Sequence, residues 1–169
     1  MARVYMTCGK ICSGKSTYAQ KLRRQHSAAV LSVDEITLAL FGLAPGDMLD
    51  EYVRRTEEYL YQKSVELVET GINVVLDWGF WTKRERDEAR RFYASHGIAC
   101  GFHYLEIGDQ EWFRRIAKRN ADVLAGRTEA YYVDDGLARK FADIFEAPSP
   151  NEIDVWIKGE DQQHDHQTV

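Results

Sequence analysis

Residues 4–17 read VYMTCGKICSGKST, and this stretch decides the fold class of the chain. From Gly9 to Ser16 it matches the pattern G-x-x-x-x-G-K-[ST], in which backbone N–H groups and a lysine surround phosphate groups. At ordinary residue frequencies, a random chain of this length would contain the pattern about once in 200 tries. The apolar run before it predicts a strand over Val4–Cys8, and Lys15–His26 predicts a helix whose positive end faces the loop. The sequence therefore predicts a phosphate site between the first strand and the first helix.

Each residue of this loop has an expected role in holding a nucleotide. Gly9 and Gly14 permit the backbone turns that aim successive N–H groups inward. Lys15 brings a mobile positive charge to the β- and γ-phosphates, and Ser16 offers its hydroxyl to Mg²⁺. Further nucleotide contacts are expected from Lys10, Cys12, Ser13 and Thr17, with Thr17 alternatively supporting the first helical turn. A glycine-rich turn without a ligand is the other interpretation, but it would leave the lysine among amide donors without a compensating anion.

The composition is that of a globular protein, and it excludes several classes. The chain has 169 residues, 44% hydrophobic and 29% charged, which indicates one domain over 1–158 and a polar, disordered tail at 159–169. No apolar run approaches the ~18 residues of a membrane span. The net charge of −5 argues against a protein whose main role is to coat nucleic acid. Three cysteines, an odd number in a chain that needs no disulfides, favour a reducing cytoplasm.

Strand and helix patterns alternate along the rest of the chain. Further strands are predicted over 28–33, 72–76, 98–107 and 153–157, and helices over 35–41, 48–70, 82–96, 109–120 and 133–145. Thr82 and Glu85 match a capping box at the start of one helix, and Asp109 is expected to cap another. Such alternation implies parallel crossovers and a doubly wound α/β sheet. Substrates of these sheets bind beyond the carboxyl ends of the strands. The loop after the first strand, Asp34 and Asp77 are all expected at that edge.

Two carboxylates and a group of aromatic residues are candidates for the acceptor side of the site. Asp34 is expected to take the proton of an acceptor hydroxyl near the γ-phosphate, or to cap the helix that follows it. Asp77 is expected to hold a Mg²⁺-bound water or the acceptor, or to form a turn. Trp78, Phe80 and Trp81 would form an apolar wall for the acceptor, or pack under the next helix.

Basic residues cluster on the helix that begins near Asp109. Arg115 and Arg119 are four residues apart, a spacing at which like charges repel unless a polyanion lies between them and the loop. We expect both to contact phosphate and nucleotide, the alternative being a solvated basic face. Arg127 follows in a loop, from which a lid arginine could reach the transferred phosphoryl group.

These residues resemble the small P-loop kinases, specifically the AAA_33-type ATP-binding proteins, a group similar to chloramphenicol phosphotransferase, the zeta toxins and the kinase half of polynucleotide kinase. The resemblance rests on residues 8–17, 32–35, 74–81, 84–86, 115–120 and 145–150. It implies ATP as donor, Mg²⁺, and a three-layer P-loop NTPase fold with a five-stranded parallel sheet of order 2-3-1-4-5. It also implies a small helical lid, at about 119–136, a base-like Asp34, and lid arginines at Arg115 and Arg119.

The acceptor is the variable part of that group. The first hypothesis is an ATP-dependent kinase of a small hydroxyl compound such as an antibiotic, a sugar or a nucleoside. A second is a kinase of a nucleotide sugar or of a polynucleotide end, although no basic groove suited to nucleic acid stands out. A third is a nucleotide-gated binding protein or slow NTPase without transfer chemistry. The oligomeric state stays open.

Overall fold

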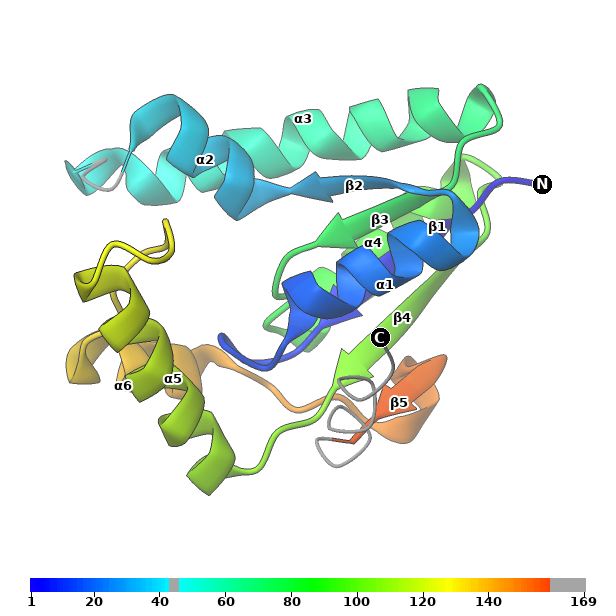
Figure 1. The fold of residues 1–169 in the computed structure, drawn as a ribbon. Helices are drawn as coiled ribbons and strands as arrows, with labels where there is room; N and C mark the ends of the chain where they lie inside the picture. Colours follow the sequence, from blue (N-terminus) through cyan, green and yellow to red (C-terminus); the bar gives the residue numbers. More distant parts are fainter. Residues whose placement is uncertain (43–45, 159–169) are drawn as a thin grey trace.

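A five-stranded parallel sheet forms the centre of the computed structural model, which describes residues 1–42 and 46–158 (Figure 1). Its strands are β1 (Val4–Cys8), β2 (Ala29–Ser32), β3 (Val74–Asp77), β4 (Cys100–Leu105) and β5 (Val155–Ile157). They are arranged β2-β3-β1-β4-β5, and each neighbouring pair is parallel. The predicted fold class and strand order are confirmed. The tail expected at 159–169 lies outside the described residues.

Helices connect the strands and cover both faces of the sheet (Figure 1). They are α1 (Lys15–His26), α2 (Val33–Phe41), α3 (Leu49–Glu69), α4 (Lys83–Ser95), α5 (Asp109–Leu124) and α6 (Asp135–Ile144). Short 3-10 helices lie at Gly46–Met48 and Pro150–Glu152. Within the described part of the chain, none of the helices combines the length and apolarity that crossing a bilayer requires.

The central strand β1 divides the core into two parts. Val4 and Met6 face one apolar cluster, in which Tyr93 of α4 is fully buried. Tyr5, pointing the other way, packs in a second cluster with Leu22 of α1. Because both faces of the sheet are covered, all five residues of β1 are buried, and Thr7 is the one polar residue among them.

The start of α2 differs from the prediction in a way that bears on Asp34. The helix begins at Val33, and Ser32 is its N-cap, with Oγ accepting a hydrogen bond from the Glu35 N–H at 3.4 Å. The interpretation of Asp34 as the cap is therefore wrong. Asp34 lies inside the first helical turn with an exposed side chain, so its carboxylate is not engaged in capping.

The connection from α5 to α6 also differs from the prediction. Gly108 rather than Asp109 is the N-cap of α5, and the helix continues past the predicted end at Asn120 to Leu124. The Asn120 side chain donates to the Val133 carbonyl at 2.7 Å and accepts from the Val133 N–H at 2.9 Å. The segment expected to form the lid thus comprises the end of α5 and a loop held against it.

A buried ion pair joins the start of α4 to the segment before β5. The capping box predicted at Thr82 and Glu85 is present and begins α4. One turn into the helix, the Arg86 guanidinium donates to Glu152 at 2.9 Å, and to the Phe80 carbonyl at 3.1 Å. The Arg86 side chain is 2% exposed and that of Glu152 12%. Because Arg86 also binds the Phe80 carbonyl, this ion pair holds the loop that follows β3 against α4.

Replacing Arg86 by alanine should destabilise the fold strongly, because Glu152 would stay buried without its partner. We expect the free energy of unfolding to fall by about 3 kcal/mol or more in urea titrations at neutral pH. The neighbouring Arg84 is 81% exposed, and its ion pair with Glu88 is long, at 3.8 Å. Arg84→Ala should therefore change the free energy of unfolding by less than about 0.5 kcal/mol. Equal effects of the two substitutions would contradict this prediction.

Candidate active site

The loop between β1 and α1 leaves the N-terminus of α1 without a side-chain cap. Gly9 has φ of +149°, and a Cβ added there would lie 2.8 Å from both the Leu105 carbonyl and the Ser13 hydroxyl. Gly14 and Cys12 also have positive φ, so the chain turns tightly around the loop. Gly14 is the N-cap of α1 and provides no side-chain cap, and no acidic residue lies in the first turn. The positive end of α1 is thus open to an anion.

Lys15 folds over this loop. Its Nζ donates to the carbonyls of Gly9 at 3.0 Å and Lys10 at 2.8 Å, and it lies 5.7 Å from the centre of the Trp81 ring. Burial lowers the pKa of Lys15, and the nearby carboxylates of Asp77 and Asp34 oppose that shift. A bound polyphosphate would add negative charge at the same place and stabilise the ammonium form.

Three buried polar atoms around the loop lack a hydrogen-bond partner. They are Ser13 Oγ, Arg119 Nε and Tyr131 Oη. Buried polar groups are normally paired, so unpaired ones in a native site point to a missing ligand or water. Arg119 and Tyr131 line a cleft at the carboxyl ends of the strands, and their donors, together with the uncapped α1 terminus, fit a phosphate chain.

A cleft of 1650 Å³ lies at the carboxyl ends of the strands. It is lined by the loop, by α1 and the start of α2, by the first half of α3, by residues 77–79 and 81, by Glu85 of α4, and by α5, α6 and the segment between them. Gly14, Lys15, Ser16 and Thr17 line it, as expected for nucleotide contacts, and so does Cys12. The Ser13 hydroxyl is buried within the loop itself.

Asp77 and Ser16 meet at the base of this cleft. Asp77 ends β3 and is buried, and its pKa is raised by burial, an effect opposed by hydrogen bonds from Ser16 and Thr7 and by the charge of Lys15. Within the described residues, no three acidic, histidine or cysteine side chains converge as a metal cage. Mg²⁺ is usually bound by one or two protein oxygens, with substrate phosphates and water as its other ligands. The Ser16 hydroxyl and the Asp77 carboxylate fit that ion.

Asp34 lines the cleft from the α2 side. It is exposed, and its charge acts on both Lys15 and Asp77. The structure therefore brings the two predicted carboxylates and the loop lysine to one edge of the sheet.

The two α5 arginines contact the loop directly. Arg115 donates to the Ser13 carbonyl at 3.0 Å while its Nε pairs with Glu111 at 2.7 Å. Arg119 Nη1 lies 3.6 Å from the Cys12 sulfur. Both residues line the cleft.

Two other predicted site residues point elsewhere. Arg127 is exposed, pairs with Asp122 at 2.6 Å and does not line the cleft. Lys10 pairs with Asp109 at 2.9 Å and lies 4.8 Å from the centre of the Trp112 ring, so it faces α5 rather than the cleft. The structure thus separates both side chains from the loop lysine.

Sequence reasoning missed Trp112 and Tyr131. Trp112 is buried and its indole N–H donates to the Ile11 carbonyl at 2.7 Å, which fixes α5 against the phosphate-binding loop. Tyr131 lines the cleft from the connection to α6. Neither belongs to a short motif, and the only available signal was an aromatic residue beside the basic cluster.

The aromatic residues after β3 divide between wall and core. Trp78 and Trp81 line the cleft, and Trp81 stacks on Phe141 of α6 with ring centres 5.0 Å apart. Phe80 is 2% exposed and packs edge-on against Phe102 at 5.0 Å, so it also serves the core. A Cβ on Gly79 would lie 2.4 Å from the Trp81 indole nitrogen, which explains glycine at this position.

Comparisons with known proteins agree with this architecture. The sequence model of the AAA_33 family, described as an AAA domain, matches residues 4–140. No match was found among curated proteins.

Among solved structures, APS kinase CysC of Mycobacterium tuberculosis, in complex with AMPPNP and APS, has a TM-score of 0.65 at 22% identity, covering 96% of this chain and 92% of that one. An unliganded sugar kinase from Janibacter sp. HTCC2649 has a TM-score of 0.64 at 16% identity, covering 94% of this chain and 86% of that one. A gluconokinase from Sinorhizobium meliloti 1021 has a TM-score of 0.62 at 13% identity, covering 92% of this chain and 81% of that one. At these identities the similarity establishes a shared P-loop kinase fold.

Lys15→Ala should weaken the binding of ATP about tenfold to hundredfold, because a hydrogen bond to a charged group contributes about 1.5–3 kcal/mol. Titration of a fluorescent ATP analogue into the purified chain measures this effect. Lys63→Ala is the matched control, since Lys63 pairs with Glu66 on α3 and lines neither the cleft nor its neighbouring cavity. Unaltered affinity in Lys15→Ala would show that the nucleotide binds elsewhere.

Proposed function

The chain belongs to the AAA_33 family, and we propose that it is a phosphotransferase that moves the γ-phosphoryl group of ATP to a hydroxyl of a small molecule. The observation that supports this best is the placement of Asp34. An exposed carboxylate lines the same cleft as the phosphate-binding loop, within electrostatic range of Lys15.

In the proposed reaction, the acceptor oxygen forms a bond to the γ-phosphorus as the bond from that phosphorus to the bridging oxygen of ADP breaks. The hydroxyl proton passes to the Asp34 carboxylate, late in the step, because phosphoryl transfer has a loose transition state. Lys15, Arg115 and Arg119 stabilise the negative charge that is spread over the transferred group. Arg127 would join them only if the segment 119–136 closes as a lid.

Mg²⁺ would be held by the Ser16 hydroxyl and the Asp77 carboxylate, directly or through water. When bound it would neutralise phosphate charge and orient the γ-phosphoryl group. The chain's own contribution is the backbone of the loop, which orients the phosphates, and Trp78 and Trp81, which line the cleft beside it.

An acceptor panel tests this function. The purified chain, supplied with ATP and Mg²⁺, should release ADP only when a hydroxyl compound is accepted, and mass spectrometry should detect the phosphorylated product. The panel covers sugars, nucleosides, antibiotics and amino alcohols, with nucleotide sugars and oligonucleotides as the larger acceptors. Equal ADP release with and without every compound would instead indicate a slow NTPase.

Asp34→Asn should retain ATP binding and lower phosphoryl transfer by on the order of 10²-fold, because the amide cannot accept the hydroxyl proton. Glu35→Gln is the matched control, since Glu35 is exposed in the same turn of α2 but does not line the cleft. Comparison of kcat with the affinity for nucleotide in both variants separates the two effects. Unchanged transfer in Asp34→Asn would remove this residue from the mechanism.

A further inference from the structure

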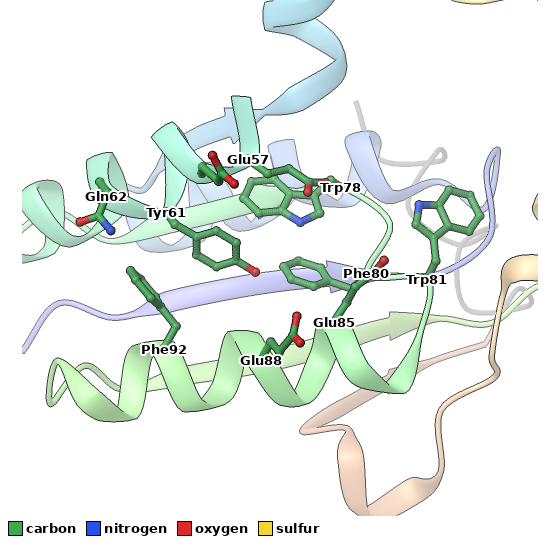
Figure 2. A pocket seen from close by; sticks show the side chains of 10 residues that line it. Glu57, Tyr61, Gln62, Trp78, Phe80, Trp81, Glu85, Glu88 and Phe92 are labelled. Atoms are coloured by element: carbon green, nitrogen blue, oxygen red, sulfur yellow. The ribbon is translucent and has the colours of Figure 1, made fainter. Parts of the chain in front are cut away.

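A second cavity, of 380 Å³, lies between α3 and α4 (Figure 2). It is lined by aromatic and acidic side chains and one amide: Glu57, Glu58, Tyr61, Gln62, Trp78, Phe80, Trp81, Glu85, Glu88 and Phe92. Four of these residues, Glu57, Trp78, Trp81 and Glu85, also line the cleft of the phosphate-binding loop. The cavity therefore adjoins the place where the phosphoryl group is transferred.

Aromatic rings form the walls of this cavity. The Tyr61 ring lies edge-on to Trp78, with centres 5.6 Å apart, and is tilted against Phe92 at 5.0 Å. Trp78 in turn stacks on Phe80 at 5.2 Å (Figure 2). These rings line the cavity at different angles to one another, and aromatic ring faces attract organic cations.

The ionisable side chains of the lining are mainly acidic. Its four ionisable carboxyl groups are all glutamates, and no lysine, arginine or histidine is among the described residues that line the cavity. Glu58 pairs with Arg54, Glu85 accepts from the Thr82 N–H at 3.0 Å, and Glu88 is 3.8 Å from Arg84. For Glu57, the described residues 1–42 and 46–158 supply no ion pair or hydrogen-bond partner.

Glu57 is held in an environment that disfavours its charge. Burial raises its pKa, and the neighbouring carboxylates of Glu85 and Glu58 add to that shift, so that the pKa lies at about 7. Glu88 and the Tyr61 hydroxyl also face the cavity and supply no positive charge. A cation entering the cavity would reverse this penalty by pairing with the Glu57 carboxylate.

The acidic and aromatic lining favours some classes of ligand over others. An anionic acceptor, such as a nucleotide sugar or a polynucleotide end, would meet four carboxyl groups and no basic residue among the lining side chains. A metal ion is also disfavoured, because within the described residues no three acidic, histidine or cysteine side chains converge on one point. An organic cation, which spreads its charge over ring faces and separate carboxylates, suits the lining best.

We propose that this cavity binds the positively charged amine of the phosphoryl acceptor, so that the substrate class is a hydroxyl compound bearing a protonated or quaternary amine. The inference rests on the proposed function and names the substrate of that same site. The amine lies against Trp78 and Tyr61 with Glu57 beside it, while the hydroxyl extends into the cleft toward Asp34. The transfer step is unchanged, with the hydroxyl proton passing to Asp34 and ADP leaving.

Binding of two probes of the same shape tests the cavity without any turnover. Calorimetry of the full chain compares choline, a quaternary amine with a hydroxyl, with its uncharged isostere 3,3-dimethylbutan-1-ol. We expect choline to bind about tenfold more tightly or better, from the ring faces and the Glu57 charge. Equal affinity of the two probes would overturn the proposal.

A substitution and a pH series locate the effect at Glu57. Glu57→Gln should reduce choline affinity about tenfold and leave the isostere unaffected, and Glu66→Gln, which removes the same charge from an exposed position of α3, should change neither. In the unsubstituted chain, choline affinity should rise from about pH 6 to pH 8, because Glu57 ionises near pH 7 and the probe's charge is constant. A flat pH profile, or an equal loss in Glu66→Gln, would count against the cavity.

Transfer assays separate this proposal from the function on which it rests. Phosphorylation of amino alcohols at a kcat/KM about tenfold or more above their neutral isosteres would support both. Transfer that prefers neutral or anionic acceptors would overturn the assigned substrate class while the kinase function stands. No transfer to any compound, with choline binding that still depends on Glu57, would overturn the function and the acceptor's role but leave a cation site.

Discussion

The site depends on one physical constraint: hydrogen-bond donors around the loop between β1 and α1 have no acceptor within the protein. The first turn of α1 has no side-chain cap, and Gly9 lies too close to the Leu105 carbonyl for any side chain. Burying Ser13 Oγ and Arg119 Nε without partners is unfavourable in the ligand-free protein, and a phosphate chain would relieve it. The position of β1, between β3 and β4 at the centre of the sheet, puts this loop where strand order reverses, the usual binding crevice of doubly wound sheets.

The short segment after β3 links the phosphate end of the molecule to the second cavity. Asp77 lies at the base of the cleft, and Trp78 and Trp81 line both the cleft and the cavity. Phe80 has a positive φ of 45°, an uncommon conformation for a bulky residue, and its carbonyl is held by Arg86. The buried ion pair of Arg86 with Glu152 thus helps to determine the position of the rings that follow β3.

Basic and acidic side chains are unevenly distributed over the site. Arg115 and Arg119 on α5 contact the phosphate-binding loop, whereas the second cavity is lined by four glutamates of α3 and α4, of which Glu57 and Glu85 also line the cleft. A polyanionic donor and a cationic acceptor would each meet the complementary side. Such complementarity affects the specificity and the association rate of binding more than the affinity. It also distinguishes this cavity from a purely apolar acceptor pocket.

The sequence by itself determined the phosphate-binding loop, the alternation of strands and helices, the Thr82 capping box and the position of Asp77 at the end of a strand. Each depends on residues close together in the chain, whose spacing and periodicity are visible without the fold. Only the tertiary structure turned Lys10 toward Asp109, joined Trp112 to the Ile11 carbonyl and set Glu57 of α3 opposite the glutamates of α4. These relations arise where elements distant in sequence pack together, and a side chain's partner across such a contact is set by packing geometry that no local pattern encodes.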